Sequence, residues 1–533
     1  MKVWQVGPKV KRDEIVKILV DKRGLELKSI RPEKLTLKSV GIKTVAVKKA
    51  VTRIKRAIKD QETVVVYGDY DADGIGATAI MWEALHGLGV NVWPFIPHRE
   101  EHGYGLSIKG IEAMIAERRP SLVVTVDNGI VAHQAAKKLV QEKIDLIITD
   151  HHQVGKKLPE AMAIIHTTQL CGAGVAWMVA KEMNPPAAQT SLDVAALGTV
   201  ADMMELKGAN RSLVKYGLPK LRQTDRVGLI ELYQEAGLEP VTIDTYAINF
   251  LVAPRLNATG RLSHGLDSLR LLCTHDRQRA KELAQTLGQA NKDRQSLLQV
   301  QLDHARLKLG VKVKQEKILV VADEAYHQGV IGLIAGKLTE EFYRPSVVLS
   351  IKGEQAKASA RSIPGFNIIE AIRTAEDLVI EAGGHPMAAG FSVEVAKITA
   401  LTERLRSVAE KELDEEKLQP VVRVDCEVEA KDISLGLWKE LEQLAPFGVG
   451  NPRPTLALMG VTTAQARPVG GEGKHLKLRL KELPQAEAIG FNLGALLPQL
   501  TSGRRVDVAF QLNKNVWNGR ERLELKIKDL RLC

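Results

Sequence analysis

The sequence is poor in cysteine, in aromatic residues and in long apolar runs. Its four cysteines, among 533 residues, lie far apart and form no CxxC pair. This excludes a disulfide framework and a cysteine zinc site, and it favours reduced thiols in a cytoplasmic protein. Aromatic residues make up only 4% of the chain, so its cores must be mainly aliphatic. No apolar run reaches the roughly 18 residues of a membrane span and the first residues lack a signal-peptide pattern, so we expect no membrane association.

Basic charge is concentrated at the two ends of the chain. The net charge is +11, to which residues 1–60 contribute +12 and residues 501–533 contribute +4, leaving −5 for the middle. Basic ends suit a polyanion such as nucleic acid, although a charged surface that keeps the protein soluble explains the same numbers. The length exceeds that of one domain and predicts two to four.

From residue 63 onward, short apolar segments alternate with helical ones. The segments 63–67, 90–97, 121–126 and 144–149 are rich in valine and isoleucine. Runs of this length between helical segments are typical of parallel strands covered on both faces. The region therefore predicts an α/β fold of the doubly wound type, completed by helices up to about residue 275.

The second half of the sequence predicts further domains. A long polar helix, a second α/β unit and a charged stretch, "EKELDEEKLQP", follow one another, and strands that alternate apolar and polar residues then suggest a small OB-like β-barrel. We expect this division: a basic N-terminal segment (1–60), a catalytic domain (61–275), a connecting helix (276–309), a substrate-binding domain (310–415) and a nucleic-acid-binding barrel (420–533).

Acidic and imidazole side chains follow three of the predicted parallel strands. They are the aspartates of "DYDADG" (residues 69–74), Asp127 in "VDNGI", and His151 and His152 in "TDHH". Because functional groups in open α/β sheets gather outside the carboxyl ends of the strands, these side chains should meet at one rim. Asp202 in "GTVADM" is able to join them from a helix.

Each motif alone has an ordinary structural explanation, since an aspartate after a strand is commonly a helix N-cap. Together they are hard to explain in that way, because at least four converging carboxylates repel one another unless cations neutralise them. The motifs contain no lysine or arginine. Carboxylate and imidazole ligands favour Mn²⁺ or Mg²⁺ over Ca²⁺, and two such ions serve the hydrolysis of phosphate esters. We therefore expect two divalent metal ions, Mn²⁺ in the first place.

The four motifs "DYDADG", "VDNGI", "TDHH" and "GTVADM" resemble those of the DHH phosphoesterase family. The later "GGHPMAAGF" resembles the DHH-associated substrate-binding domain of that family. Two further segments, "PRLNATGR" and "LAPFGVGNPRP", resemble one branch of it, the RecJ single-stranded-DNA exonucleases. The resemblance covers about residues 60–533 and implies the family's fold and activity.

The resemblance also implies a ligand set. The implied metal ligands are Asp71, Asp73, Asp127, His151 and Asp202, with Asp127 bridging two ions. Many relatives have a histidine where this chain has Tyr67, and Asp69 is the nearest substitute. His152 would orient the substrate or stabilise the transition state, and the ions would lower the pKa of the attacking water.

Three features favour a polynucleotide substrate: the basic ends, the basic terminal barrel and the second α/β unit. The resemblance assigns a terminal 5′-phosphate contact to Arg99, and arginine offers a planar fork that matches phosphate oxygens. His385 would approach the scissile phosphate, and Trp517 is a candidate for base stacking. The full set of expected substrate-binding residues is Arg99, Asn257, Arg261, Ser359, Arg361, Gly383, Gly384, His385 and Trp517.

The sequence thus predicts a metal-dependent exonuclease that degrades single-stranded DNA from its 5′ end to mononucleotides, in DNA repair and recombination. We expect a cytoplasmic monomer, with a single-strand-binding protein or a helicase as partners. Two alternatives stay open. One is a phosphodiesterase of the same family that acts on short oligonucleotides or cyclic dinucleotides, and the other is a replication scaffold that has lost its metals.

Overall fold

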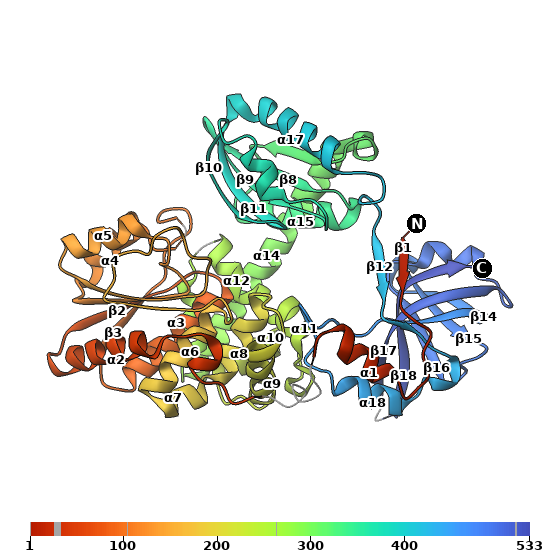
Figure 1. Cartoon of the computed structure of the whole chain (residues 1–533), viewed down its shortest axis with the longest axis horizontal. Coiled ribbons are helices and arrows are strands. Elements are labelled where there is room, and N and C mark those ends of the chain that lie inside the picture. The colour runs from red at the N-terminus through yellow and green to blue at the C-terminus, as the bar shows by residue number, and fades with distance from the viewer. Residues whose placement is uncertain (1, 26–32, 104, 263, 518–519) are drawn as a thin grey trace. The chain divides into compact units, whose positions relative to one another are not determined.

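The computed structural model describes residues 2–25, 33–103, 105–262, 264–517 and 520–533, and these form two compact units (Figure 1). The smaller unit contains residues 292–423 together with the first residues of the chain, and the larger contains residues 6–291 and 424–533. Helix α14 (Arg277–Leu309) runs from the larger unit into the smaller one. This is the long helix expected over residues 276–309.

A five-stranded parallel sheet forms the centre of the catalytic domain. Its strand order is β3-β2-β4-β5-β6, and every pairing is parallel. The strands are β2 (Thr63–Tyr67), β3 (Asn91–Phe95), β4 (Leu122–Val126), β5 (Asp145–Asp150) and β6 (Ala163–His166). The predicted doubly wound fold is confirmed, because helices cover both faces of this sheet (Figure 1).

Alternate residues of β2 show how the two faces are filled. Val64 and Val66 pack into one core with helices α2 (Thr44–Lys59), α3 (Ala72–His86) and α6 (Gly172–Met183). Val65 and Tyr67 pack into the other with α4 (Ile108–Arg118) and α5 (His133–Gln141). A strand buried on both faces needs apolar residues at every position, which explains the continuous run "VVVY".

Helices complete the catalytic domain after β6. They are α7 (Pro185–Thr190), α8 (Leu192–Ala201), α9 (Gly208–Arg222), α10 (Val227–Glu235), α11 (Thr245–Ala247), α12 (Ala253–Leu262) and α13 (Leu266–Cys273). A π-helical turn, Ile248–Val252, lies between α11 and α12. None of the helices among the described residues is both long and apolar enough to cross a membrane.

The basic N-terminal segment expected over residues 1–60 is shared between two domains. Helix α1 (Ile15–Lys22) contributes Ile15 and Leu19 to the core of the C-terminal barrel, and β1 (Val3–Val6) pairs with β12 (Val421–Val424). Helix α2 packs on the catalytic sheet instead.

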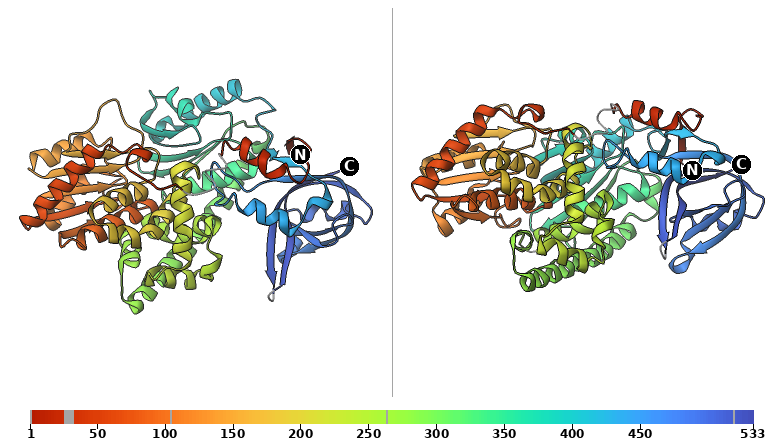
Figure 2. Two further views of the ribbon diagram at one scale, coloured as in Figure 1. Left: turned by 60° about the horizontal axis from the view of Figure 1, so that its bottom comes forward. Right: turned by 90° about the horizontal axis from the view of Figure 1, so that it is seen from below.

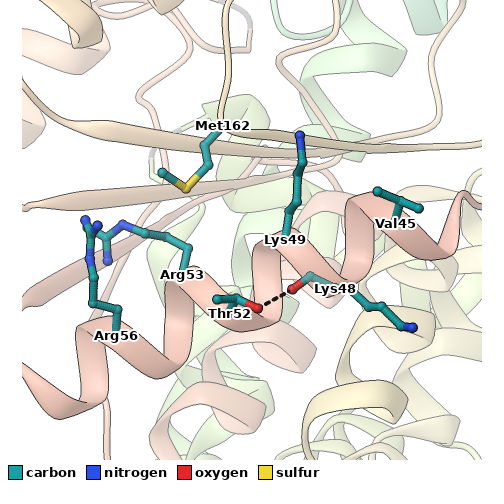
Figure 3. Close-up of a pocket in the computed structure, with 7 residues that line it drawn as sticks. All are labelled: Val45, Lys48, Lys49, Thr52, Arg53, Arg56 and Met162. Carbon is teal, nitrogen blue, oxygen red and sulfur yellow. Dashed lines mark hydrogen bonds between the residues drawn. The ribbon is translucent and has the colours of Figure 1, made fainter.

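Ion pairs fasten helix α2 to the amino ends of the strands. The guanidinium of Arg53, which is 4% exposed, donates to Asp145 and to Glu62 at 2.5 Å each, and Arg56 donates to Asp145 at 3.1 Å. Figure 3 shows Arg53 and Arg56 side by side below Met162, where they line a cavity of about 400 Å³. Two of the six basic residues of α2 therefore serve its attachment to the sheet.

The smaller unit contains a mixed sheet of order β10-β11-β9-β8-β7, in which only β7 and β8 are parallel. Its strands are β7 (Leu319–Asp323), β8 (Ser346–Lys352), β9 (Gln355–Arg361), β10 (Val379–His385) and β11 (Ala388–Glu394). Its helices after α14 are α15 (Ile331–Phe342), α16 (Ile368–Arg373) and α17 (Ile398–Glu412).

The C-terminal domain contains a closed barrel of five strands in the order β14-β15-β16-β18-β17, which the pairing of β14 with β17 closes, and the short strand β13 pairs with β14 (Figure 2). Its elements are β13 (Cys426–Glu427), α18 (Leu435–Glu442), β14 (Leu456–Val469), β15 (His475–Leu480), β16 (Ala486–Gly490), β17 (Arg505–Trp517) and β18 (Arg520–Leu532). The long strand β14 pairs with two strands of the barrel: its first half pairs with β17 and its second half pairs with β15.

The barrel and the catalytic domain belong to the same unit and are joined by Arg211 of α9. This side chain is 1% exposed and donates hydrogen bonds of 2.8 Å to the carbonyl of Leu444 and 2.9 Å to that of Ala445. The segment "LAPFGVGNPRP" therefore has a structural role in connecting the two domains.

Candidate active site

The acidic residues gather at the carboxyl ends of β2, β4 and β5, as expected for a parallel sheet. The loop after β2 carries the first group. Asp71 is the N-cap of α3 and accepts a hydrogen bond of 2.9 Å from the amide of Gly74. Asp69 is 1% exposed. Its Oδ1 accepts a hydrogen bond of 2.7 Å from the amide of Tyr70, and its Oδ2 accepts no hydrogen bond within the described residues.

Asp73, in the first turn of α3, is held by another helix. Its carboxylate accepts hydrogen bonds of 2.7 Å from the amide of Gly172 and 2.9 Å from that of Ala173, at the start of α6. A helix N-terminus stabilises a negative charge, because its amides are unpaired and its dipole is positive there. Position 172 must be glycine, because a Cβ atom there would lie 2.4 Å from Cβ of Asp127. Glycine lets the start of α6 lie close to both Asp73 and Asp127.

Asp127 and His151 form the centre of the site. Asp127 follows β4 with a left-handed φ of 62°, which aspartate tolerates better than most residues. Its Oδ1 lies 3.1 Å from Nε2 of His151, but this oxygen is buried and accepts no hydrogen bond of proper geometry within the described residues. The same imidazole nitrogen lies 3.8 Å from Oδ2 of Asp202 and 3.9 Å from Oδ2 of Asp73.

Asp150, the aspartate of "TDHH", holds the two histidines in place, although no metal, catalytic or substrate-binding role was predicted for it. Its Oδ1 lies 2.8 Å from Nδ1 of His152 and accepts from the amide of His151 at 2.6 Å, while its Oδ2 accepts from the amide of Ile130 at 2.8 Å. His166 contributes a further contact, with Nε2 2.7 Å from the carbonyl of His152. The signal was in the sequence, because Asp150 is the first residue of the "DHH" triplet.

Burial and mutual repulsion perturb the pKa values of the acids. Burial, with the charge of Asp71 adding to it, raises the pKa of Asp69 to about 7. Burial and the charges of Asp73 and Asp71 raise the pKa of Asp202 to about 8, and similar causes raise that of Asp127 well above its ordinary value. His152 and Arg99 act to lower the pKa of Asp69, and His152 does the same for Asp202, but they offset the increase only in part. Bound cations would supply further positive charge.

The two histidines differ in their electrostatics. Burial lowers the pKa of His151, so its neutral imidazole is available as a ligand. Burial also acts to lower the pKa of His152, but the hydrogen bond and the charge of Asp150 raise it to about 9. A protonated His152 suits contact with phosphate charge better than metal ligation.

The residues present fit two divalent cations. Ligand atoms of Asp73, His151 and Asp202 all lie within 4.8 Å of one another, and so do those of Asp127, His151 and His152. The two groups share His151, and the buried oxygen of Asp127, which accepts no hydrogen bond within the described residues, is available to a cation beside it. Asp69 and Asp71 interact electrostatically with the same cluster.

Tyr67 occupies the position at which many relatives carry a histidine, and the structure gives it another task. Its ring is fully buried beside that of Phe95, with the two ring centroids 5.1 Å apart. Its hydroxyl donates a hydrogen bond of 3.1 Å to the carbonyl of Gly105. It therefore fixes the loop that precedes α4. The nearby Asp69 keeps one unsatisfied oxygen and remains the proposed substitute.

Three expected substrate-binding residues border the acidic loop. The guanidinium of Arg99 lies 5.5 Å from the ring centroid of Tyr70, and Arg99 and Arg261 both lower the pKa of the Tyr70 hydroxyl, which burial raises to about 12. Asn257 of α12 accepts 2.6 Å from the amide of Ala72. This third contact is with protein, so Asn257 acts at least in part by positioning the loop.

Five expected residues lie in the smaller unit, on neighbouring strands of one sheet. Through β11, Ser359 of β9 is in register with Gly383 of β10, and Arg361 is in register with His385. Because alternate residues share a face, these four lie on the same face of the sheet. Nη1 of Arg361 donates 3.1 Å to Oγ of Ser359, and the remaining residue, Gly384, lies between the two rows.

Trp517, the proposed stacking residue, ends β17 and pairs in register with Arg520. Its side chain lies outside the described residues. Strand β15 of the same barrel carries Lys477 and Arg479, both of which contact Glu487 at 2.5 and 2.7 Å.

A doubly wound sheet with this acidic rim is the architecture of a DHH phosphoesterase. The family model "DHH family, N-terminal domain" matches residues 63–199, "DHHA1 domain" matches residues 315–411, and "RecJ OB domain" matches residues 424–529. This chain belongs to the RecJ family, the branch of that class to which its curated relatives also belong.

Those relatives are named single-stranded-DNA-specific exonuclease RecJ. The protein of Thermus thermophilus is 35% identical over 497 residues, which cover 91% of this chain and 71% of the relative. The protein of Dickeya dadantii is 32% identical over 90% of this chain and 89% of the relative. The protein of Bacillus subtilis is 37% identical over 90% of this chain, and the match spans 63% of its own length.

Two solved structures support the assignment to the RecJ family. The crystal structure of RecJ from T. thermophilus in complex with Mn²⁺ has a TM-score of 0.83 and 30% identity, covering 99% of this chain and 79% of that one. A second structure of an exonuclease RecJ bound to manganese has a TM-score of 0.62 and 33% identity, covering 72% of this chain and 97% of that one. These comparisons confirm the resemblance drawn from the sequence and the fold class, and both solved relatives contain manganese.

Proposed function

We propose that this chain hydrolyses single-stranded DNA from its 5′ end and releases 5′-mononucleotides, with two divalent cations. The observation that carries the proposal is the buried Oδ1 of Asp127, which lies 3.1 Å from Nε2 of His151, the residue that the two possible groups of ligand atoms share. Cations bound there supply Lewis-acid activation of water and stabilisation of phosphate charge. The residues that would hold them are Asp71, Asp73, Asp127, His151 and Asp202, with Asp69 in place of the missing histidine.

His152 acts on the phosphate in this proposal. Asp150 holds Nδ1 of the ring and keeps the imidazole protonated, since the pKa of His152 is raised to about 9. A fixed positive charge that needs no rearrangement stabilises the charge that develops on the phosphate oxygens.

Arg99 and Arg261 recognise the 5′ end. A terminal phosphate carries more negative charge than an internal diester, and bidentate arginine contacts to phosphate are strong. Both arginines act on Tyr70, next to the acidic loop, so a phosphate seated on them places the following diester near the metal ligands. This arrangement accounts for release of one nucleotide at a time from the 5′ end.

The smaller unit and the barrel hold the rest of the strand. We assign phosphate contacts to Ser359, Arg361 and His385 and backbone contacts to Gly383 and Gly384, since this sheet face brings them together. The barrel would bind more distant nucleotides through its basic strands and Trp517.

The setting follows from the same activity. We propose that the protein acts as a monomer in the cytoplasm, in DNA repair and recombination. A single-strand-binding protein or a helicase would supply the single strand that the proposed reaction needs.

The test uses single strands, duplexes and dinucleotides, each labelled at the 5′ or the 3′ end, with Mn²⁺ or with chelator. We expect labelled mononucleotide to appear first from 5′-labelled single strands, and only with metal. Preferential cleavage of dinucleotides would favour the short-oligonucleotide alternative, and early release of the 3′ label would overturn the polarity.

A further inference from the structure

A second pocket lies at the free edge of the catalytic sheet, beside β3. It has a volume of about 750 Å³ and is lined by residues of α3, β3, α4, α13 and α14, all within the larger unit. The lining includes Trp82, Trp93, Arg118, Arg270 and Arg279. The volume lies within the range of about 300–1,000 Å³ that is usual for small-ligand sites.

The aromatic part of the pocket consists of two of the chain's six tryptophans. The ring nitrogen of Trp93 donates a hydrogen bond of 3.1 Å to the side-chain oxygen of Asn91. The ring nitrogen of Trp82 donates one of 3.3 Å to the carbonyl of Val92. Both indole N–H groups are therefore used by the protein itself. Trp93 is nonetheless 41% exposed, an unusual degree for so large an apolar ring in a chain with few aromatics.

The charged part of the pocket is mainly cationic, with three arginines and one carboxylate, that of Glu117. The guanidinium of Arg118 lies 3.7 Å from the ring centroid of Trp93, and within the described residues it forms no ion pair. Such stacking fixes the plane of an arginine while its N–H groups stay available to an anion. Arg270 and Arg279 pair only with neighbours on their own helices, at 3.0 and 3.4 Å, and exposed pairs of this kind are weak.

A planar aromatic surface beside an oriented guanidinium matches one class of ligand, a nucleobase that carries a phosphate. We propose that this pocket binds a nucleotide, with the base against the exposed indole of Trp93 and the phosphate on Arg118 and its neighbouring arginines. Base stacking on aromatic side chains is tolerant of sequence and adds to phosphate contacts. The ligand has two sources, a free mononucleotide or one nucleotide unit of a longer strand.

The pocket is separate from the metal site. Arg118 ends α4, which precedes the amino end of β4, whereas Asp127 follows the carboxyl end of that strand. Five residues of β4 at about 3.3 Å each separate the two ends by roughly 16 Å. The proposal uses none of the metal ligands and holds whether or not the proposed hydrolysis is correct.

The test measures binding of radiolabelled deoxyadenosine 5′-monophosphate to the full chain by equilibrium dialysis, in chelator so that hydrolysis is silent. We expect Trp93→Ala and Arg118→Ala each to weaken binding by about tenfold, with unchanged thermal unfolding midpoints. Lys137→Ala, at an exposed lysine of α5, is the matched control and should bind normally. Deoxyadenosine and inorganic phosphate should each bind more weakly than the nucleotide that combines them.

An oligodeoxyadenylate with a 5′-hydroxyl distinguishes the two sources. If Trp93→Ala and Arg118→Ala weaken binding of the oligonucleotide alone, the pocket binds a unit of the strand. If they weaken binding of the mononucleotide, it binds the free nucleotide. Normal binding of both ligands by both variants overturns the proposal, and so does loss of all mononucleotide binding in Arg99→Ala, which would locate the nucleotide at the metal site.

Discussion

The side-chain oxygen of Asn257 accepts a hydrogen bond of 2.6 Å from the amide of Ala72, and it thereby ties α12 to the loop that carries Asp71 and Asp73. Ala72 is the first residue of α3, so its amide has no partner within the helix. A residue of the "PRLNATGR" segment thus satisfies a helix end nearly two hundred positions earlier in the chain.

Replacement of Asn257 separates positioning from DNA contact. Asn257→Ala should destabilise the protein by about 1–3 kcal/mol, because a partly buried amide loses its acceptor, and it should weaken Mn²⁺ binding. Asn257→Ser keeps an uncharged oxygen acceptor without adding charge to the acidic cluster, and it should restore part of the stability and of the metal affinity, measured by thermal unfolding and by calorimetry. If Ser behaves like Ala in both measurements, the hydrogen bond to Ala72 is not what matters.

Replacement of Asp127 by asparagine should abolish hydrolysis and stabilise the metal-free protein. Asparagine tolerates the left-handed backbone at this position and removes one buried negative charge, so the metal-free variant should be more stable than the metal-free parent by at least about 1 kcal/mol. Hydrolysis and the stabilisation by Mn²⁺ should both be lost, while affinity for single-stranded DNA in chelator should persist. Near-normal turnover at saturating Mn²⁺ would contradict the bridging role.

The metal-free protein should become more stable as the pH falls from about 8 toward 5. The pKa values of Asp69, Asp127 and Asp202 are raised in the folded state, so the folded state binds more protons than the unfolded state in this range. The free energy of unfolding then decreases as the pH rises through these values. Unfolding midpoints in chelator should show this slope, and saturating Mn²⁺ should flatten or invert it.

Replacement of Arg99 by alanine should reduce the preference for a 5′-phosphate. Single-turnover rates on 5′-phosphorylated and 5′-hydroxyl strands, measured at one salt concentration, should become more alike, with a loss of about tenfold or more on the phosphorylated strand. Lys137→Ala again serves as the control for a lost surface charge. An unchanged ratio of the two rates would mean that Arg99 does not read the 5′ end.

The sequence was sufficient for much of this fold and for the acidic part of the site. Valine-rich strands, the α14 pattern and three acidic motifs at strand ends follow local rules of periodicity and topology. Other features depend on contacts between distant segments. The amides of Gly172 and Ala173 that hold Asp73, and the hydroxyl of Tyr67 that holds Gly105, have no local signature. The pocket beside Trp93 likewise draws on five elements that only the folded sheet brings together.

Arg211 also limits how the protein can be taken apart. Its guanidinium is buried and depends for hydrogen bonds on carbonyls just ahead of the barrel, at Leu444 and Ala445. A truncated chain without residues 424–533 would lose these acceptors and expose the guanidinium to water, so the truncation would also change the surface of the catalytic domain. The three domains are thus not interchangeable modules. The contribution of the barrel to strand affinity is better measured with charge-reversing substitutions on its surface than with a deletion.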